Sequence, residues 1–409
     1  MKQWPMILAL ILTYIIFAIL LNSVGAVILQ VIHHYGVSKQ HASTLEGFKD
    51  LPIAIISFLF ASFLPRLGYK SALQMSLFLV AFACFAMPFI PTFLTTQIHF
   101  LILGVSFALV KVSIYASIGI ITRNQQQHAS LLNTVEGFFM VGVLLGNWLF
   151  SLFIHDSGSG NNEWLTVYWL LGGLCVINLF LLHSTAMPNV KMPNFNTFLY
   201  DFKRMLNLIA HSLVLVFILS TFIYVLIEQS ISTWLPTFNH EILQFPRTMS
   251  VQAASIFAAS LALGRLLAGI LLRKMPWYHL LTGCVLAMAV LMIVILPATQ
   301  DISIPSPITW QTAPLATFLL PLVGFFMAPI YPAISSVMLS TLPKSQHAAM
   351  TGLIVIFSAL GGTTGSLLTG NLFNAFGGQK AFYLLLLPLT LLYFTIHGFR
   401  HYSQRTVIG

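Results

Sequence analysis

Seven charged side chains stand inside stretches of sequence that are otherwise apolar enough for a lipid bilayer. A charge near the centre of a bilayer costs at least about 2.5 to 3.5 kcal/mol on insertion scales, so such residues are expected to face an interior cavity, pair with one another and serve a function. Buried carboxylates can bind and release protons, and a nearby cation favours their ionised form. The seven are Glu46, Lys49, Asp50, Lys111, Glu136, Glu228 and Arg265.

Glu46 and Asp50 are four residues apart, a spacing that stacks two carboxylates on one helical face about 6 Å from each other. Carboxylates that close repel, so either a cation lies between them or one holds a proton. We expect Lys111 to be that cation. Counted from the nearest turns at about 1.5 Å per residue, Asp50, Lys111 and Glu136 differ in depth by only about 4 to 6 Å. The sequence therefore predicts a cluster of these three residues near the midplane.

Two interpretations of this cluster stay open. In the functional interpretation, Lys111 changes its carboxylate partner during alternating access, and this change couples proton transfer to the binding of a solute. In the structural one, a static ion pair holds the helices together. Glu46 lies about one turn from the outer surface and Lys49 is long enough to snorkel there. For these two, a solvated or gating role is an alternative to proton coupling.

Other polar residues in the apolar stretches offer directional hydrogen bonds to a polar solute. Glu228 begins a polar face of hydroxyls and an amide, which suits either a solute or helix packing. Arg265 stands among small residues in GRLLAG, where a structural contact is the favoured role. The residues expected to bind a solute are Asn22, Tyr115, Asn133, Glu228 and Tyr331.

The elements that must position these residues are membrane-spanning helices. Of the 409 residues, 58% are hydrophobic and only 7% are charged, which excludes a soluble globular protein. Only helices or closed barrels satisfy their backbone in lipid, and apolar runs of about 20 residues are long enough for helices. The twelve predicted spans are 5–33, 42–64, 71–92, 97–122, 129–154, 164–184, 206–236, 248–273, 277–298, 311–340, 348–375 and 379–400.

The placement of the basic residues predicts the orientation. Twelve of the 18 Lys and Arg residues lie at the termini and in alternate loops, so both termini are expected in the cytoplasm. The net charge of +9 is therefore no sign of nucleic-acid binding. The three cysteines all fall inside spans, and no motif supports an enzyme, an ATP-driven pump, a metal site or a cofactor.

A polar connection divides the chain into two halves. We expect domains at 1–184 and 206–409, each a bundle of six helices, joined by a cytoplasmic linker at 185–205. A short sequence motif recurs at the starts of spans 2, 5, 8 and 11, where it reads QHAS, QHAS, QAAS and QHAA, respectively. That placement is typical of inverted triplets of helices nested in two parallel halves. Pro329, Pro332 and the segment ALGGTTG at 359–365 predict kinks and close approaches of helices.

This layout resembles the major facilitator superfamily over essentially the whole chain. The loop FASFLPRLGYKSAL resembles the family's G-x-L-x-D-R-x-G-R-K motif and retains Arg66, Gly68 and Lys70, but Leu64 or Pro65 replaces its acidic residue. The missing acid puts in doubt the usual charge latch between domains. The resemblance implies structural roles for Arg66 and Lys70.

Two further segments, YVLIEQSISTWLPTF (224–238) and GFFMAPIYPAISS (324–336), are similar to spans 7 and 10 of the fucose:proton symporter branch. The resemblance implies an all-α membrane protein that carries a small polar, sugar-like solute with protons, by alternating access, as a monomer in a bacterial inner membrane. Its partners would be the solute, protons and the bilayer. Efflux, or transport of siderophores or drugs, is the alternative within this fold. A receptor or scaffold that transports nothing is the alternative from another class.

Overall fold

The computed structural model describes residues 4–60, 68–122, 125–155, 162–185, 207–299, 308–343 and 346–406. Within these ranges the regular structure is entirely helical. In the described part of the chain, eleven helices are long and apolar enough to cross a membrane. The remaining predicted span, at 42–64, corresponds to α4, whose described part is 17 residues long and carries three charges. The prediction of an all-α membrane protein with twelve spans is confirmed.

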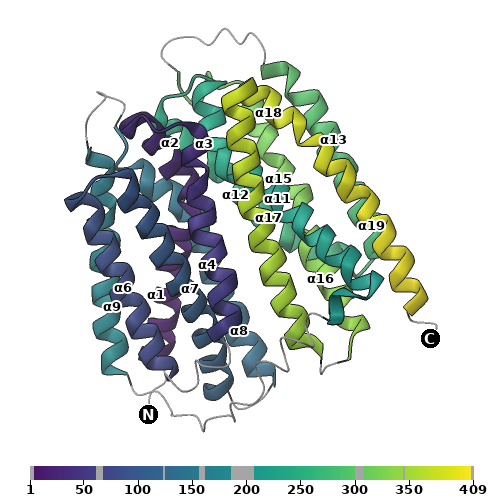
Figure 1. The fold of residues 1–409 in the computed structure, drawn as a ribbon, viewed down its shortest axis with the longest axis horizontal. Coiled ribbons are helices and arrows are strands. Elements are labelled where there is room, and N and C mark those ends of the chain that lie inside the picture. Colours follow the sequence, from purple (N-terminus) through teal and green to yellow (C-terminus); the bar gives the residue numbers. More distant parts are fainter. Residues whose placement is uncertain are drawn as a thin grey trace. The chain divides into compact units, whose positions relative to one another are not determined.

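The first six predicted spans form long helices that run side by side (Figure 1). Span 1 is broken into α1 and α2, and span 6 begins with the short turn η1. The elements are α1 (Trp4–Asn22), α2 (Val24–Tyr35), α3 (Lys39–Ala42), α4 (Thr44–Phe60), α6 (Tyr69–Phe89), α7 (Phe93–Ile121), α8 (Gln125–Ser151), η1 (Asn162–Thr166) and α9 (Val167–Ser184).

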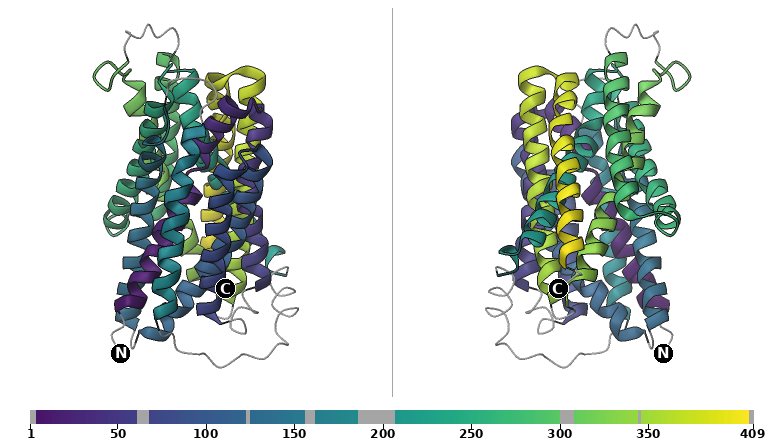
Figure 2. Two further views of the ribbon diagram at one scale, coloured as in Figure 1. Left: turned by 90° about the vertical axis from the view of Figure 1, so that its left-hand side faces the viewer. Right: turned by 90° about the vertical axis from the view of Figure 1, so that its right-hand side faces the viewer.

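The last six predicted spans are also side by side, as the two views of Figure 2 show. The tenth span is the most interrupted one. The elements are α11 (Ser212–Glu241), α12 (Arg247–Leu271), α13 (Trp277–Ile295), η3 (Pro297–Thr299), α14 (Ala316–Leu319), η4 (Leu320–Leu322), α15 (Val323–Met327), α16 (Ile330–Thr341), α17 (His347–Phe376), α18 (Gly378–Leu384) and α19 (Leu386–Thr406).

The chain divides into two compact units. The first contains residues 1–37 and 48–198, and the second contains residues 38–47 and 199–409. The division between 198 and 199 falls among residues 186–206, which lie outside the described part and include all of the predicted linker except Thr185. The units differ from the predicted domains in the segment 38–47, which packs with the second unit.

Two glycines bring α8 close to α1 in the first unit. A Cβ atom on Gly142 would lie 2.8 Å from the backbone oxygen of Ile15, and one on Gly146 would lie 3.3 Å from that of Ile19. Small residues four apart let two helix backbones approach closely without a driving force from water. The glycine pair therefore fixes how far α8 slides along α1.

The second unit repeats this contact between α11 and α17. A Cβ atom on Gly361 or Gly365 would clash with the backbone oxygen of Phe222 or Leu226, respectively. Gly361 and Gly365 lie 219 residues after Gly142 and Gly146 of α8. The residues whose backbone oxygens they approach lie 207 residues after the corresponding residues of α1. The QHAS and QHAA phrases at 127 and 346 are also 219 residues apart. The predicted repeat, and the close approach predicted at ALGGTTG, are confirmed for these helices.

Prolines interrupt span 10 where the sequence predicts a kink. α15 ends at Met327 and α16 begins at Ile330, with Pro329 at the N-cap position. Pro332 lies in the first turn of α16, where its missing amide hydrogen costs no helical bond. By contrast, α17 runs unbroken through ALGGTTG, so the glycines there serve close packing and not a break.

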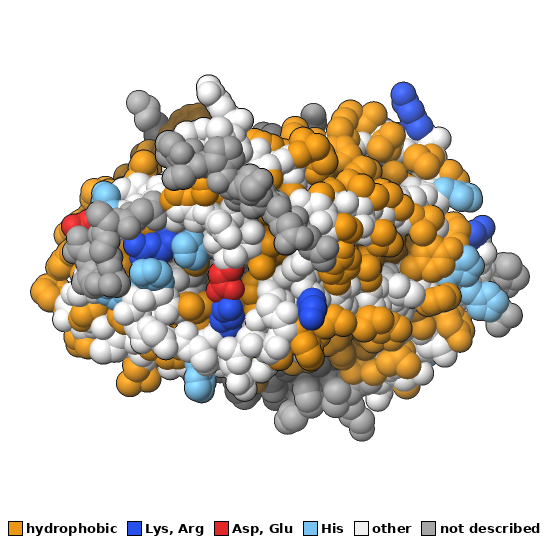
Figure 3. Space-filling view, turned by 90° about the horizontal axis from the view of Figure 1, so that it is seen from above, with side chains coloured by type: hydrophobic (Ala, Val, Ile, Leu, Met, Phe, Trp, Pro, Cys, Tyr) orange, Lys and Arg blue, Asp and Glu red, His pale blue; other side chains and the backbone are white. Residues whose placement is uncertain are grey.

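Hydrophobic side chains also predominate on the surface. On the end face drawn in Figure 3, only a few acidic and basic side chains appear among them. Large apolar side chains on the flanks are well exposed, including Phe82, Phe180 and Phe394 at 66%, 70% and 63%. Exposure of that extent is what a lipid-facing surface requires.

Candidate functional site

Glu136 on α8 accepts hydrogen bonds from two tyrosines in the first unit. The hydroxyl of Tyr14 on α1 donates to Oε1 of Glu136 at 3.3 Å. The hydroxyl of Tyr115 on α7 donates to the same oxygen at 2.5 Å. Three helices thus meet at one carboxylate, in a part of the chain where an unsupported charge would be costly.

The two tyrosines differ in their surroundings. Tyr14 is buried, and its ring lies 5.0 Å from that of Phe139 and 6.2 Å from that of Phe107. Tyr115 is 37% exposed. The close contact of α1 with α8 holds Tyr14 at the level of Glu136, whereas the ring of Tyr115 is open on one side.

Lys111 lies one turn before Tyr115 on α7 and is half-buried. The charge of Glu136 acts on its ammonium group. The structure therefore places two members of the predicted cluster, Lys111 and Glu136, in one electrostatic neighbourhood, with Tyr115 beside them.

Asp50, the third member of the predicted cluster, has a nearer cation. Nζ of Lys49 lies 3.5 Å from Oδ1 of Asp50 and donates to the backbone oxygen of Leu21 at 3.4 Å. Leu21 is in the last turn of α1, where carbonyl groups lack helical donors. Lys49 is only 6% exposed, so the alternative in which it snorkels to the surface is wrong. Lys111 as a partner of Asp50 stays a prediction.

The packing of α4 on α7 separates Lys111 from Asp50 in depth. A Cβ atom on Gly104 of α7 would clash with the backbone oxygen of Lys49 on α4, so these residues share a level. Lys111 is seven residues further along α7, about 10 Å at 1.5 Å per residue. This exceeds the 4 to 6 Å expected from turn positions, because counting from turns ignores how helices slide against each other.

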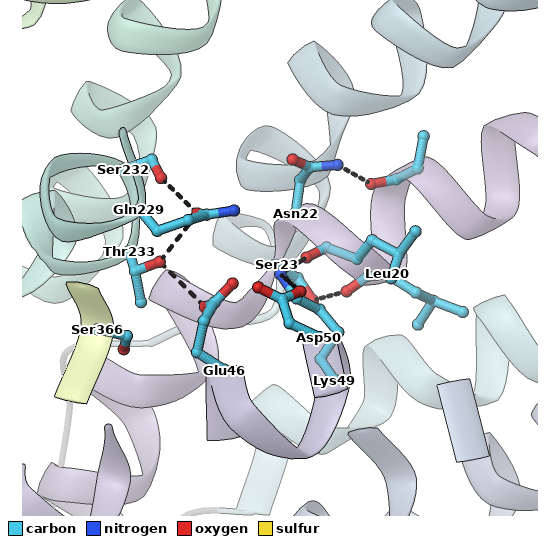
Figure 4. A network of polar contacts seen from close by, with 12 residues as sticks. Leu20, Asn22, Ser23, Glu46, Lys49, Asp50, Gln229, Ser232, Thr233 and Ser366 are labelled. Carbon is cyan, nitrogen blue, oxygen red and sulfur yellow. Dashed lines mark hydrogen bonds and ion pairs between the residues drawn. The ribbon is translucent and has the colours of Figure 1, made fainter. Parts of the chain in front are cut away.

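Glu46 belongs to the second unit, although it stands at the start of α4. Oε2 of Glu46 accepts a hydrogen bond from Oγ1 of Thr233 on α11 at 3.0 Å (Figure 4). Its exposure is 0%, which excludes the solvated alternative. Nearby, Oγ of Ser366 on α17 donates to the backbone oxygen of Ser43 at 3.3 Å. The segment 38–47 is thus held by both α11 and α17.

A second carboxylate of this unit, Glu228, also lies among tyrosines and a cation. Oε1 of Glu228 on α11 is 3.8 Å from Nη2 of Arg265 on α12. The ring of Tyr224 stacks on that of Tyr331 with centroids 5.7 Å apart, and the charges of Glu228 and Arg265 act on both hydroxyls. The structural role expected for Arg265 therefore includes an ion pair with a residue expected to bind a solute.

The remaining predicted residues are placed as follows. Asn22 is exposed, and its Nδ2 donates to the backbone oxygen of Ala18 at 2.8 Å. Nζ of Lys70 donates to the backbone oxygens of His183 and Thr185 at 2.9 and 2.5 Å, which ties α6 to the end of α9. Arg66 and the side chain of Asn133 lie outside the described residues.

Sequence reasoning missed Tyr14 as a partner of Glu136. Its hydroxyl lies in a largely apolar span, and a buried tyrosine hydroxyl generally has a hydrogen-bond partner. That rule marks Tyr14 as a candidate, but it does not say which carboxylate it meets. The glycine pair of α8 is the signal that could have supplied the register.

A family model described as Major Facilitator Superfamily matches residues 7–320, more than half of the chain. The chain belongs to the major facilitator superfamily. No curated protein sequence matches it.

Solved transporters share the fold of this superfamily member at low identity. A bacterial homolog of the human lysosomal transporter Spinster is 14% identical, with a TM-score of 0.76 and coverage of 98% of this chain and 96% of that one. The nucleoside transporter NupG is 14% identical, with a TM-score of 0.73 and coverage of 98% and 99%. The E. coli fucose:proton symporter FucP, as the N162A variant, is 14% identical, with a TM-score of 0.61 and coverage of 96% and 97%.

Proposed function

We propose that this member of the superfamily is a proton-coupled symporter that takes up a small polar, sugar-like metabolite by alternating access. The observation that carries the proposal is the Glu136 carboxylate inside α8, held by two tyrosine hydroxyls beside Lys111. A carboxylate in a membrane span is costly, and such residues commonly form proton relays. A carboxylate whose partners are exchangeable hydroxyls and a cation can change its protonation state during a transport cycle.

The proposal assigns roles to the polar residues of each unit. Proton coupling is assigned to Glu46, Asp50, Lys111 and Glu136. Solute binding is assigned to Asn22, Tyr115, Asn133, Glu228 and Tyr331, and structural roles to Arg66, Lys70 and Arg265. Hydroxyl and amide groups suit a solute with many hydroxyls, because each can donate and accept in directional hydrogen bonds.

The solutes of structurally similar transporters support the same class of solute. One is a fucose:proton symporter and another a nucleoside transporter, so both solutes carry a sugar ring. We further propose that the protein works as a monomer in a bacterial inner membrane, with both termini in the cytoplasm, because the basic residues concentrate at the termini and in alternate loops.

The test measures solute-driven proton entry. Purified protein in liposomes with an internal pH-sensitive dye is given an imposed pH gradient, and fucose, D-glucose and uridine are added in turn. We expect at least one of them to accelerate proton entry. Glu136→Gln and Asp50→Asn should abolish this acceleration, since neither amide can take up the proton.

The matched control is Glu163→Gln. Glu163 lies in η1, is half-exposed and pairs with His155 at 3.1 Å, so its change removes one carboxylate away from the proposed machinery. It should retain solute-driven proton entry. Undiminished entry in both Glu136→Gln and Asp50→Asn would reject the assigned coupling residues, and no entry with any of the three solutes would reject the proposed solute class.

A further inference from the structure

The two hydroxyls at Glu136 bind the same oxygen atom. Tyr14 and Tyr115 both donate to Oε1, whose two lone pairs are thereby used. Donors to a carboxylate favour its ionised form, so loss of either donor makes protonation easier. In the described parts of α1 and α7, which pack on α8, the titratable groups that act on this carboxylate are Tyr14, Tyr115 and Lys111.

Only one of these hydroxyls is placed to leave. The ring of Tyr14 is buried against those of Phe107 and Phe139, so its hydroxyl oxygen cannot move away without disturbing the core. The ring of Tyr115 is 37% exposed and its hydroxyl makes the shorter bond to Glu136. Polar groups that contact a charge inside a span generally face water and not lipid, so the exposed side of Tyr115 is expected to face water.

We propose that Tyr115 binds the solute through a hydroxyl that exchanges between Oε1 of Glu136 and a hydroxyl group of the solute. When a solute hydroxyl takes the tyrosine hydroxyl, Glu136 loses a donor and takes up one proton from water. When the solute leaves, Tyr115 returns and the proton is released. The tyrosine keeps its own proton throughout. This inference rests on the proposed function, and it adds the group through which solute and proton favour each other's binding.

The first part of the test needs no solute. The infrared carboxyl band of Glu136 is identified as the band that disappears in Glu136→Gln. The intensity of this band is then followed as a function of pH in the full chain in nanodiscs. Tyr115→Phe and Tyr14→Phe should each move the half-titration pH of this band upward by roughly one to two pH units, because each removes a hydrogen bond to the charged form. Tyr393→Phe, the same change on α19 of the second unit, should leave it in place.

The second part adds fucose, D-glucose or uridine at millimolar concentration. We expect at least one of these probes to move the midpoint upward in the unmodified protein and in Tyr14→Phe, but not in Tyr115→Phe. A probe-induced shift that persists in Tyr115→Phe would overturn the proposed exchange. So would a midpoint in Tyr115→Phe that equals that of the unmodified protein.

These outcomes separate this inference from the proposed function. If proton entry into liposomes is driven by a solute but Tyr115→Phe titrates normally, the symport proposal stands and the role of Tyr115 falls. If no probe shifts the midpoint in the unmodified protein, the exchange is rejected for these solutes. In that case the first part still decides whether Tyr115 donates to Glu136.

Discussion

At the scale of single residues, Glu136 and Glu46 contact hydroxyl groups, whereas Asp50 and Glu228 contact cations. Tyr115 and Thr233 approach Glu136 and Glu46 to 2.5 and 3.0 Å, whereas the ion pairs of Asp50 and Glu228 measure 3.5 and 3.8 Å. Strong bonds between ammonium or guanidinium groups and carboxylates are about 2.7 to 2.9 Å long. Hydroxyls can be replaced by the hydroxyls of water or a solute, so these contacts suit a site that changes partners.

A substitution at Thr233 tests this point for Glu46. Thr233→Val keeps the shape of the side chain but removes the donor to a fully buried carboxylate, which should cost about 1.5 to 3 kcal/mol. The melting temperature of the detergent-solubilised protein should fall. Ser232→Ala is the comparison, because Oγ of Ser232 donates to the neutral amide of Gln229 at 2.9 Å. The melting temperature of this variant should fall less than that of Thr233→Val. Equal melting temperatures for both variants would contradict the assigned bond.

At the scale of helices, glycine pairs set the register of the two matching contacts. α8 meets α1, and α17 meets α11, through small residues at the same repeat positions. Both contacts place a polar group of one helix at a fixed level of the other. In the first unit this group is the carboxylate of Glu136 beside Tyr14, and in the second it is the backbone oxygen of Gly365, which accepts from Oγ of Ser230 at 3.1 Å.

Adding one methyl group at a glycine tests the close approach. Gly365→Ala should lower stability by about 1 to 3 kcal/mol, because the new methyl overlaps the backbone of Leu226. Gly269→Ala is the matched control, since a Cβ atom there has no atom within 4 Å. The fraction of protein that stays monodisperse after heating reports the difference. A loss at Gly269→Ala equal to that at Gly365→Ala would refute the helix contact as the cause.

At the scale of the whole chain, the sequence halves and the compact units are not the same. Residues 38–47 precede the second half by more than 150 positions, yet they pack in its unit. Nζ of Lys39 pairs with Oε2 of Glu241 at 2.7 Å, and the backbone oxygen of Lys39 is 2.9 Å from a Cβ atom built on Gly370. The second unit is therefore incomplete without a segment of the first half.

Separate expression of the halves tests this dependence. The fragment 206–409 alone lacks residues 38–47 and should melt at a lower temperature than the same fragment co-expressed with 1–184. A tagged 206–409 fragment, followed by fluorescence during heating, gives the comparison. As a control, co-expression with a 1–184 fragment carrying Lys39→Glu should restore less stability, since it places two acidic groups together. Identical melting in all three cases would contradict the packing of this segment.

Part of the candidate site was predictable because a charge stands out in an apolar sequence. Glu46, Asp50 and Glu136 were found in this way, because the apolar residues around them place them within spans. The partner groups were harder to predict. Thr233 and Tyr14 are ordinary residues of helices, and Lys49 is a nearer cation for Asp50 than the more distant Lys111 on which the prediction relied.

The sequence by itself determined that this protein is a helical membrane protein, where its spans lie, and that its halves repeat. Those properties depend on local composition and period, since a run of about 20 apolar residues can satisfy its backbone in lipid only as a helix. Only the tertiary structure decided which hydroxyl meets which carboxylate. A helix can slide or turn against its neighbour without any change in its own hydrogen bonds, so the register comes from side-chain packing between helices far apart in the sequence.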